Sequence, residues 1–272
     1  MQLLVTTTNP HKLDEIRQVF AAEPDAAGLT WLDFAEVGRE RGEPITEPVE
    51  DQPTFEGNAR LKARHYAQQT GHICIADDSG LEVDALDGRP GVHSARYSTP
   101  PGQTPGPRAQ VDPANNRKLL DELADVPADR RNARFVCAMA FHVPPSRLVD
   151  LPALAPRSPR FRTPGISPAD PSATAPAPDA DHGLTLTVRG TFEGRILLPH
   201  EADDPAAPHA GRGAQGFGYD PLFVLPDDHP HHPGLTSAQL TADQKNQLSH
   251  RGHAARQLLL TLRDLGLLGR PD

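Results

Sequence analysis

The sequence lacks long hydrophobic runs and is poor in cysteine. No apolar stretch approaches the roughly 18 residues of a membrane span, and the opening MQLLVTTTNPHK has neither the basic nor the long apolar segment of a secretory signal. The two cysteines, Cys74 and Cys137, lie in separate apolar runs without Cys-x-x-Cys or Cys/His ligand spacing. This pattern disfavours a disulfide framework or a zinc site. We therefore expect a soluble cytoplasmic protein with buried thiols and no membrane partner.

Positive charge is also scarce. The chain has 27 Lys and Arg residues against 36 Asp and Glu residues, a formal net charge of −9. This balance argues against a nucleic-acid polymer or an anionic membrane surface as the main partner. A protein of this charge that binds phosphates must gather its few cations at one place.

Core-forming residues are diluted. Apolar residues make up 37% of the 272 residues and aromatic residues 5%, beside 30 prolines and 22 glycines, so part of the chain adds length without adding core. Ten prolines fall between residues 144 and 181 without helical or strand periodicity, and we expect a disordered or loosely held insertion there. A partner-binding segment is the alternative. We expect one domain over residues 1–272, with Pro-rich insertions at about 99–113, 144–183 and 199–213.

Strand-like and helix-like patterns alternate along the rest of the chain, which predicts an α/β fold. The expected strands cover residues 2–8, 72–76, 133–143, 184–197 and 219–225. The expected helices cover residues 11–22, 54–69, 241–249 and 253–265, and a further helix begins at Asp112-Pro113. Thr54 is a plausible N-cap, Gly71 a plausible helix end, and Thr241 with Gln244 a capping box.

The first polar cluster runs from Thr6 to Lys12, between the first expected strand and the first expected helix. Hydroxyls, free helix N–H groups and one lysine can converge on an anion in such a turn, so it is a candidate phosphate site. It is not the glycine-rich P-loop. The alternative is a polar turn capped by Asn9, with Lys12 in solvent.

The second cluster is the acidic turn expected at Asp77-Asp78-Ser79-Gly80, with Glu47 and Glu50 upstream. Two adjacent carboxylates at a strand end suit Mg²⁺, which takes one or two carboxylates plus waters and phosphate oxygens. Such a site can direct water at phosphorus. The alternative is a turn whose carboxylates cap backbone N–H groups. The apolar strand before the turn favours the functional interpretation.

Two further segments can contact a planar base. Gly216-Phe217-Gly218-Tyr219-Asp220-Pro221 places aromatic rings beside glycines, where a base can stack close to the backbone. Lys245 and Ser249-His250-Arg251 gather donors for a base edge or a phosphate. The alternatives are core packing for the two aromatic side chains and a solvated helix face for the lysine and arginine.

Five motifs, taken in their order along the chain, resemble the inosine triphosphate pyrophosphatase family, the bacterial non-canonical purine nucleoside triphosphate pyrophosphatases (XTP/dITP diphosphatases). They are Phe55-Glu56-Gly57-Asn58-Ala59 through Lys62-Ala63, Ala76-Asp77-Asp78-Ser79-Gly80-Leu81, Pro90-Gly91-Val92-His93-Ser94-Ala95-Arg96-Tyr97, the Gly216–Pro221 segment, and Ser249-His250-Arg251-Gly252. Each motif alone is weak, but five in sequence are specific. The resemblance covers residues 1–97, 115–141, 190–197 and 212–265. One departure is Thr8, where the family commonly has glycine.

The resemblance implies an elongated fold with a long central mixed sheet flanked by helices, and two lobes with an active-site cleft between them. It implies a homodimer that hydrolyses dITP, ITP and XTP to the monophosphate and pyrophosphate with Mg²⁺, and so cleanses the nucleotide pool. By position, Asp78 is the catalytic base and a metal ligand, and Glu50 is the second metal ligand.

The resemblance also assigns substrate contacts by position. The triphosphate is expected at Thr7, Thr8, Asn9, Pro10, His11 and Lys12, with further positive charge from Lys62 and a contact from Ser79. The base pocket is expected at Phe217, Gly218, Tyr219, Asp220 and Lys245, and the purine edge is expected to be read by His250 and Arg251. Two other functions stay open: a non-catalytic nucleotide-binding or sensing protein, and a pyrophosphatase for modified pyrimidine nucleotides.

Overall fold

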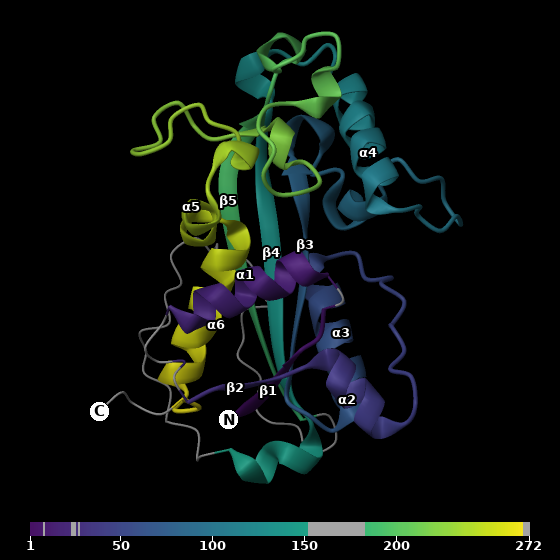
Figure 1. The fold of residues 1–272 in the computed structure, drawn as a ribbon, viewed down its shortest axis with the longest axis vertical. Coiled ribbons are helices and arrows are strands. Elements are labelled where there is room, and N and C mark those ends of the chain that lie inside the picture. Colours follow the sequence, from purple (N-terminus) through teal and green to yellow (C-terminus); the bar gives the residue numbers. More distant parts are fainter. Residues whose placement is uncertain (8, 23–25, 27, 152–182, 269–272) are drawn as a thin grey trace. The chain divides into compact units, whose positions relative to one another are not determined.

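The strands, drawn as arrows in Figure 1, form a six-stranded sheet. The computed structural model describes residues 1–7, 9–22, 26, 28–151 and 183–268. Within them the strand order is β2-β1-β3-β4-β5-β6. The strands are β1 (Gln2–Val5), β2 (Thr30–Leu32), β3 (Cys74–Val83), β4 (Asn132–Val143), β5 (Leu184–Ile196) and β6 (Phe223–Val224). β1 pairs in parallel with β2 and β3, whereas β5 and β6 are antiparallel, so the sheet is mixed as expected.

The helices are interspersed with the strands, which makes the fold α/β. They are α1 (Pro10–Ala21), α2 (Phe34–Arg41), α3 (Phe55–Thr70), α4 (Arg108–Glu122), α5 (Ala242–Leu248) and α6 (His250–Asp264). No helix in the described part of the chain is long and apolar enough to cross a membrane.

The chain divides into two compact units. Unit 1 comprises Met1–Asp78, Ala138–Arg189 and His253–Asp272, and unit 2 comprises Ser79–Cys137 and Gly190–Gly252. The chain first passes from unit 1 to unit 2 at the Asp78–Ser79 peptide bond, inside β3.

Unit 1 packs α2 and α3 beside the parallel strands β1 and β3. Phe34 of α2 meets Tyr66 of α3 edge to face, with ring centroids 5.2 Å apart. α3 begins where the Thr54 hydroxyl accepts a hydrogen bond from the Gly57 N–H, and ends at Gly71 with φ of 69°. The predicted N-cap and the predicted end of this helix are therefore confirmed, and both follow from local backbone chemistry.

Unit 2 has its own apolar core. Its members come from β3, α4, β4, β5, β6 and the loops around them, and include Leu81, Leu119, Phe135, Phe192, Leu222, Phe223 and Leu240. The ring of Phe135 lies 4.5 Å from that of Phe223, between centroids. This core is continuous with the loop that carries Tyr219, since that side chain belongs to the same cluster.

Five expectations about element ends need correction. β1 ends at Val5, short of the expected strand over residues 2–8. Residues 77–80 form no turn, because β3 continues to Val83. α4 begins at Arg108, before the expected start at Asp112, and carries Pro113 as its sixth residue, where proline removes one helical hydrogen bond. α6 begins at His250 instead of residue 253, and β6 covers two residues of the expected seven. The segments β2 and α2 were not predicted.

The proline-rich stretches behave differently from one another. Residues 108–113 belong to α4. Residues 199–213 contain 3₁₀ helices at Pro199–Glu201 and Pro208–Ala210, and Glu201 accepts two 2.7 Å hydrogen bonds from Arg195. This stretch therefore packs onto unit 2. The expected insertion at 144–183 lies mostly outside the described residues. Both cysteines are free and buried, as expected.

Candidate active site

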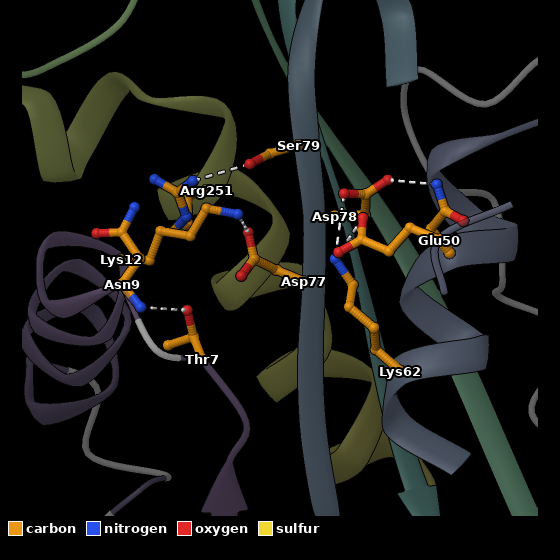
Figure 2. Close-up of polar contacts among 10 residues, drawn as sticks. Thr7, Asn9, Lys12, Glu50, Lys62, Asp77, Asp78, Ser79 and Arg251 are labelled. Carbon is orange, nitrogen blue, oxygen red and sulfur yellow. Dashed lines mark hydrogen bonds and ion pairs between the residues drawn. The ribbon is translucent and has the colours of Figure 1, made fainter. Parts of the chain in front are cut away.

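Asp77 and Asp78 have different partners because they are neighbours on a strand. Consecutive side chains of a strand point to opposite faces, and Figure 2 shows the two carboxylates leaving β3 on opposite sides. Asp77 points toward Lys12 of α1, whereas Asp78 points toward Lys62 of α3 and Glu50. The adjacent carboxylates therefore do not act as one pair on a single ion.

Local hydrogen bonds shape the turn before α1. Thr7 Oγ1 accepts a 3.2 Å hydrogen bond from the Asn9 N–H, and Leu13 N–H donates to Asn9 C=O at 3.1 Å. Pro10 and His11 are the first two residues of α1, and Lys12 Nζ lies 2.9 Å from Asp77 Oδ2. The start of a helix leaves N–H groups without helical partners. Thr8 lies outside the described residues.

Lys62 is the centre of the second ion cluster. Its Nζ lies 3.2 Å from Asp78 Oδ1 and 3.3 Å from Glu50 Oε2. The other Asp78 oxygen accepts a 3.1 Å hydrogen bond from Asn58 Nδ2. Asn58 and Lys62 stand four residues apart on α3 and so share a face of the helix. Both are buried, so α3 holds both oxygens of the Asp78 carboxylate.

Asn58 lies in one of the five motifs, but the sequence alone assigned no role to it. Its side chain links Asp78 to the loop before α3, because Asn58 Oδ1 also accepts a 3.0 Å hydrogen bond from the Gln52 N–H. The signal that could have found it is its spacing of four residues from Lys62 on a predicted helix.

The neighbourhood of Asp78 has an excess of negative charge. Burial raises the pKa of Asp78 and Glu50 raises it further, against Lys62, Asn58 and Lys12, which lower it. Burial lowers the pKa of Lys62, but Asp78, Glu50 and Asp77 together outweigh burial and raise it. Burial thus makes the Asp78 carboxyl hold its proton more tightly, whereas the three carboxylates have this effect on the Lys62 amine.

This donor set fits a divalent cation. Asp78 and Glu50 are directed at one point of positive charge, the Lys62 ammonium, so two carboxylates share one lysine. Mg²⁺ typically takes one or two protein carboxylates and completes its shell with waters and phosphate oxygens. The described residues contain no group of three or more His, Cys, Asp or Glu side chains that makes a closed metal site. The fit is therefore to a metal shared with a ligand.

In unit 2, Asp220 organises the predicted base loop. Its Oδ2 accepts hydrogen bonds from the Phe217 N–H at 2.8 Å and from Lys245 Nζ at 2.6 Å, and its Oδ1 accepts one from Ser237 Oγ at 2.8 Å. Lys245 Nζ also lies 5.3 Å from the centroid of the half-buried Phe217 ring. The loop therefore presents one aromatic ring beside a fixed cation.

The remaining predicted residues of unit 2 are buried. Tyr219 donates a 2.9 Å hydrogen bond from its hydroxyl to Ser94 C=O, and burial raises its pKa. The His250 ring stacks on Phe135 with centroids 5.1 Å apart. Arg251 Nη2 donates a 3.0 Å hydrogen bond to Ser79 Oγ (Figure 2). The Tyr219 side chain thus has the core position that was weighed as the alternative for it.

The structure therefore gathers the predicted residues into two groups, one in each unit. The group of unit 1 contains Thr7, Asn9, Lys12, Glu50, Lys62 and Asp78, with Asp77 and Asn58 added. The group of unit 2 contains Ser79 with Arg251, and Phe217 with Asp220 and Lys245. Gly218 joins the second group through its backbone.

A family model supplies the decisive comparison. The model of the Ham1 family matches residues 3–150 and 172–261. The chain belongs to the Ham1 family. The gap in the Ham1 match falls inside the proline-rich stretch between β4 and β5.

Relatives and solved structures agree with the Ham1 assignment. A dITP/XTP pyrophosphatase from Nitratidesulfovibrio vulgaris is 40% identical over 94% of this chain and 93% of its own, and one from Corynebacterium urealyticum is 38% identical over 97% and 98%. The structure of a HAM1 protein from Coxiella burnetii superposes with a TM-score of 0.64 at 27% identity, over 97% of this chain and 99% of that chain. The structure of a nucleoside-triphosphatase / dITP/XTP pyrophosphatase from Mycobacterium abscessus superposes with a TM-score of 0.58 at 33% identity, over 97% of this chain and 100% of that chain. The resemblance and the α/β fold class are confirmed.

Proposed function

We propose that this Ham1 protein hydrolyses non-canonical purine nucleoside triphosphates, namely dITP, ITP and XTP, to the monophosphate and pyrophosphate. It is then a hydrolase of acid anhydrides that removes deaminated purines from the nucleotide pool. The observation that carries the proposal is the buried Asp78 carboxylate, held by Lys62 and Asn58 beside Glu50. Near full-length relatives that carry the name dITP/XTP pyrophosphatase support it.

The triphosphate is bound by the turn before α1 and by two lysines. Lys12 supplies a charge at the helix start, where the N–H groups of the first turn also attract anions. Lys62 supplies a second charge beside Asp78. A chain with a formal charge of −9 needs this concentration of cations to bind a polyanion. Thr7, Thr8, Asn9, Pro10 and His11 complete the binding turn.

Asp78 accepts the proton of the attacking water. Its pKa is raised by burial, which makes it a stronger base than an aspartate in water. The proton goes to the carboxylate while the water oxygen bonds to the α-phosphorus and pyrophosphate leaves. Asp78 and Glu50 would hold Mg²⁺, which would supply positive charge to the phosphate oxygens. Lys12 and Lys62 offset charge on the leaving pyrophosphate.

The base is recognised by stacking and by donors. Phe217 offers a ring face, and Gly218, Tyr219 and Asp220 shape the backbone around it, with Lys245 beside the ring. His250 and Arg251 place donors for the 6-oxo group, and Ser79 positions Arg251. Adenine is rejected because its 6-amino group would set a donor against a donor.

Three further properties belong to the proposal. The metal is Mg²⁺, the active form is a homodimer, and the enzyme works in the cytoplasm. The two carboxylates of Asp78 and Glu50 at one lysine support the cation, the free buried thiols of Cys74 and Cys137 support a reducing compartment, and the family resemblance supports the dimer. The fold acts as a single catalytic domain.

A panel of nucleoside triphosphates tests the proposal. Purified protein with Mg²⁺ is incubated with dITP, XTP, dATP, dGTP and a modified pyrimidine triphosphate, and phosphate and pyrophosphate are quantified separately. We expect pyrophosphate from dITP and XTP, with kcat/KM at least about a hundredfold above that for dATP. Equal rates on dATP and dITP would contradict the specificity, and tight binding of ITP without turnover would favour the sensing function instead.

A further inference from the structure

One face of α4 carries three polar side chains, each four residues apart: Arg108, Asp112 and Asn116. Residues at this spacing lie one above the other along a helix. All three are directed at the Gly216–Asp220 loop, which lies more than 90 residues further along the chain. Two of them, Arg108 and Asp112, fall in the stretch expected to be an insertion.

Asp112 and Asn116 hold both backbone polar groups of Gly218. The Gly218 N–H donates to Asp112 Oδ2 at 3.1 Å, and Asn116 Nδ2 donates to the Gly218 C=O at 3.2 Å. Asn116 Nδ2 also lies 3.3 Å from the C=O of His209, which ties the 199–213 stretch to the same point. Arg108 lies 3.7 Å from Asp112 and stacks over the Phe217 ring at 5.8 Å from its centroid.

The Gly216–Asp220 loop needs these hydrogen bonds because its glycines would otherwise allow its backbone several conformations. Gly216 and Gly218 have φ values of 78° and 62°, and glycine visits many backbone conformations at similar cost. Asp220 holds Phe217 from within the loop, because its carboxylate accepts from the Phe217 N–H and its own N–H donates to the Phe217 C=O, whereas α4 holds the N–H and the C=O of Gly218. The orientation of the Phe217 ring thus depends on both attachments.

We propose that Asp112 and Asn116 are positioning residues that set base selectivity by fixing Gly218, and with it the stacking plane of Phe217. The inference rests on the proposed function in placing the base at Phe217. Neither residue touches the substrate. A fixed stacking plane aligns the 6-position with its donors, so a base with the wrong group cannot shift to find other partners.

The first measurement tests the hold on Gly218 without any substrate. Amide hydrogen exchange at Gly218 is followed by NMR in the wild type and in Asp112→Ala, Asp112→Asn and Arg108→Ala. We expect exchange at least about tenfold faster in Asp112→Ala, because the acceptor is lost. Asp112→Asn keeps an acceptor oxygen and Arg108→Ala keeps the hydrogen bond, so both should stay close to the wild type.

The second measurement tests selectivity, as the ratio of kcat/KM for dITP over dATP and as the ratio of Kd for ITP and ATP. We expect Asp112→Ala and Asn116→Ala to lower both ratios about tenfold, mainly through KM, and Asp112→Asn to restore them. Asp121→Ala, on the exposed face of α4, is the matched control.

The outcomes separate this inference from the function. A wild type that releases no pyrophosphate from dITP contradicts the proposed function, while the Kd ratio still judges the positioning role. Unchanged ratios in a folded Asp112→Ala overturn the inference even if exchange rises, and so does an equal loss in Asp121→Ala. Should Asn116→Ala fail to fold, the Asp112 series decides alone.

Discussion

Gly216 and Gly218 both have positive φ, but only Gly216 lacks room for a side chain. A Cβ at Gly216 would collide with the Asp220 carboxylate and lie 2.8 Å from Lys245 Nζ, whereas one at Gly218 would meet nothing within 4 Å. Gly216 therefore leaves the space that the buried Asp220–Lys245 ion pair occupies, whereas Gly218 is needed only for its backbone conformation.

We expect Gly216→Ala to lower the free energy of unfolding by about 2–4 kcal/mol, because it adds displacement of a buried pair to backbone strain. Gly218→Ala should cost only the strain, about 1 kcal/mol. Urea unfolding of both variants measures the difference. Equal losses would mean that the Asp220–Lys245 contact contributes nothing to stability.

At the scale of elements, one buried arginine joins α4 to the sheet. Arg131 is 0% exposed and donates to the carbonyls of Val126 at 2.9 Å and Leu197 at 3.0 Å, and to that of Leu123 at the end of α4. Burial lowers its pKa, but a guanidinium stays charged in proteins. A cation at a helix C-terminus is also favoured by the helix dipole.

Arg131→Met should destabilise the protein by at least about 3 kcal/mol, because it removes three hydrogen bonds and leaves only the Leu123 carbonyl with another donor, the Val126 N–H. Arg130→Met, at the exposed neighbouring position, should change stability by less than about 0.5 kcal/mol. Thermal unfolding of the two variants tests this. A small effect of Arg131→Met would show that water replaces the guanidinium at little cost.

A hydrogen-bond chain links α3, β5 and β4. Arg64 Nε donates to Thr185 Oγ1 at 3.2 Å, which leaves the Thr185 hydroxyl proton for His142 Nδ1 at 2.8 Å. Burial, with the Arg64 charge, lowers the pKa of His142 to about 4 from 6.5. His142 is thus neutral in the folded protein near pH 6.

In the unfolded chain His142 is protonated below about pH 6.5, whereas in the folded chain it is protonated only below about pH 4. Stability is therefore fully present above pH 6.5 and falls as the pH drops to about 4, by up to about 3 kcal/mol. His142→Gln should remove this part of the pH dependence, and His231→Gln, at an exposed position, should not. Urea midpoints between pH 4 and 7.5 decide; parallel curves for His142→Gln and wild type would contradict the assignment.

The sequence predicted those elements whose signals are local. The caps at Thr54, Gly71 and Thr241 follow from side-chain and backbone chemistry within a few residues, and all three are present. The prediction of an acidic turn was wrong, because adjacent aspartates are typical of turns. In the structure, Asp77 and Asp78 lie in a strand and pair with lysines from two different helices. Likewise, nothing local to Asp112 reveals that it binds Gly218, 106 residues away.

At the scale of the whole molecule, the order of the motifs predicted the family and the fold class, because each motif keeps its place along the chain. The partition of the site residues could not be predicted. Strand alternation sends Asp77 and Asp78 to different lysines, and the local charge balance depends on which carboxylates approach Lys62. These ion pairs form only when α1, α3 and β3 pack together in the folded protein.

The central claim is that Asp78 is the base of the pyrophosphatase, and comparing Asp78→Asn with Asp77→Asn tests it most directly. Pyrophosphate release from dITP with Mg²⁺ is measured for both variants. We predict that kcat falls about 10²- to 10⁴-fold in Asp78→Asn. Asp77→Asn should raise KM through Lys12 and largely spare kcat. Wild-type kcat in a folded Asp78→Asn would contradict the account.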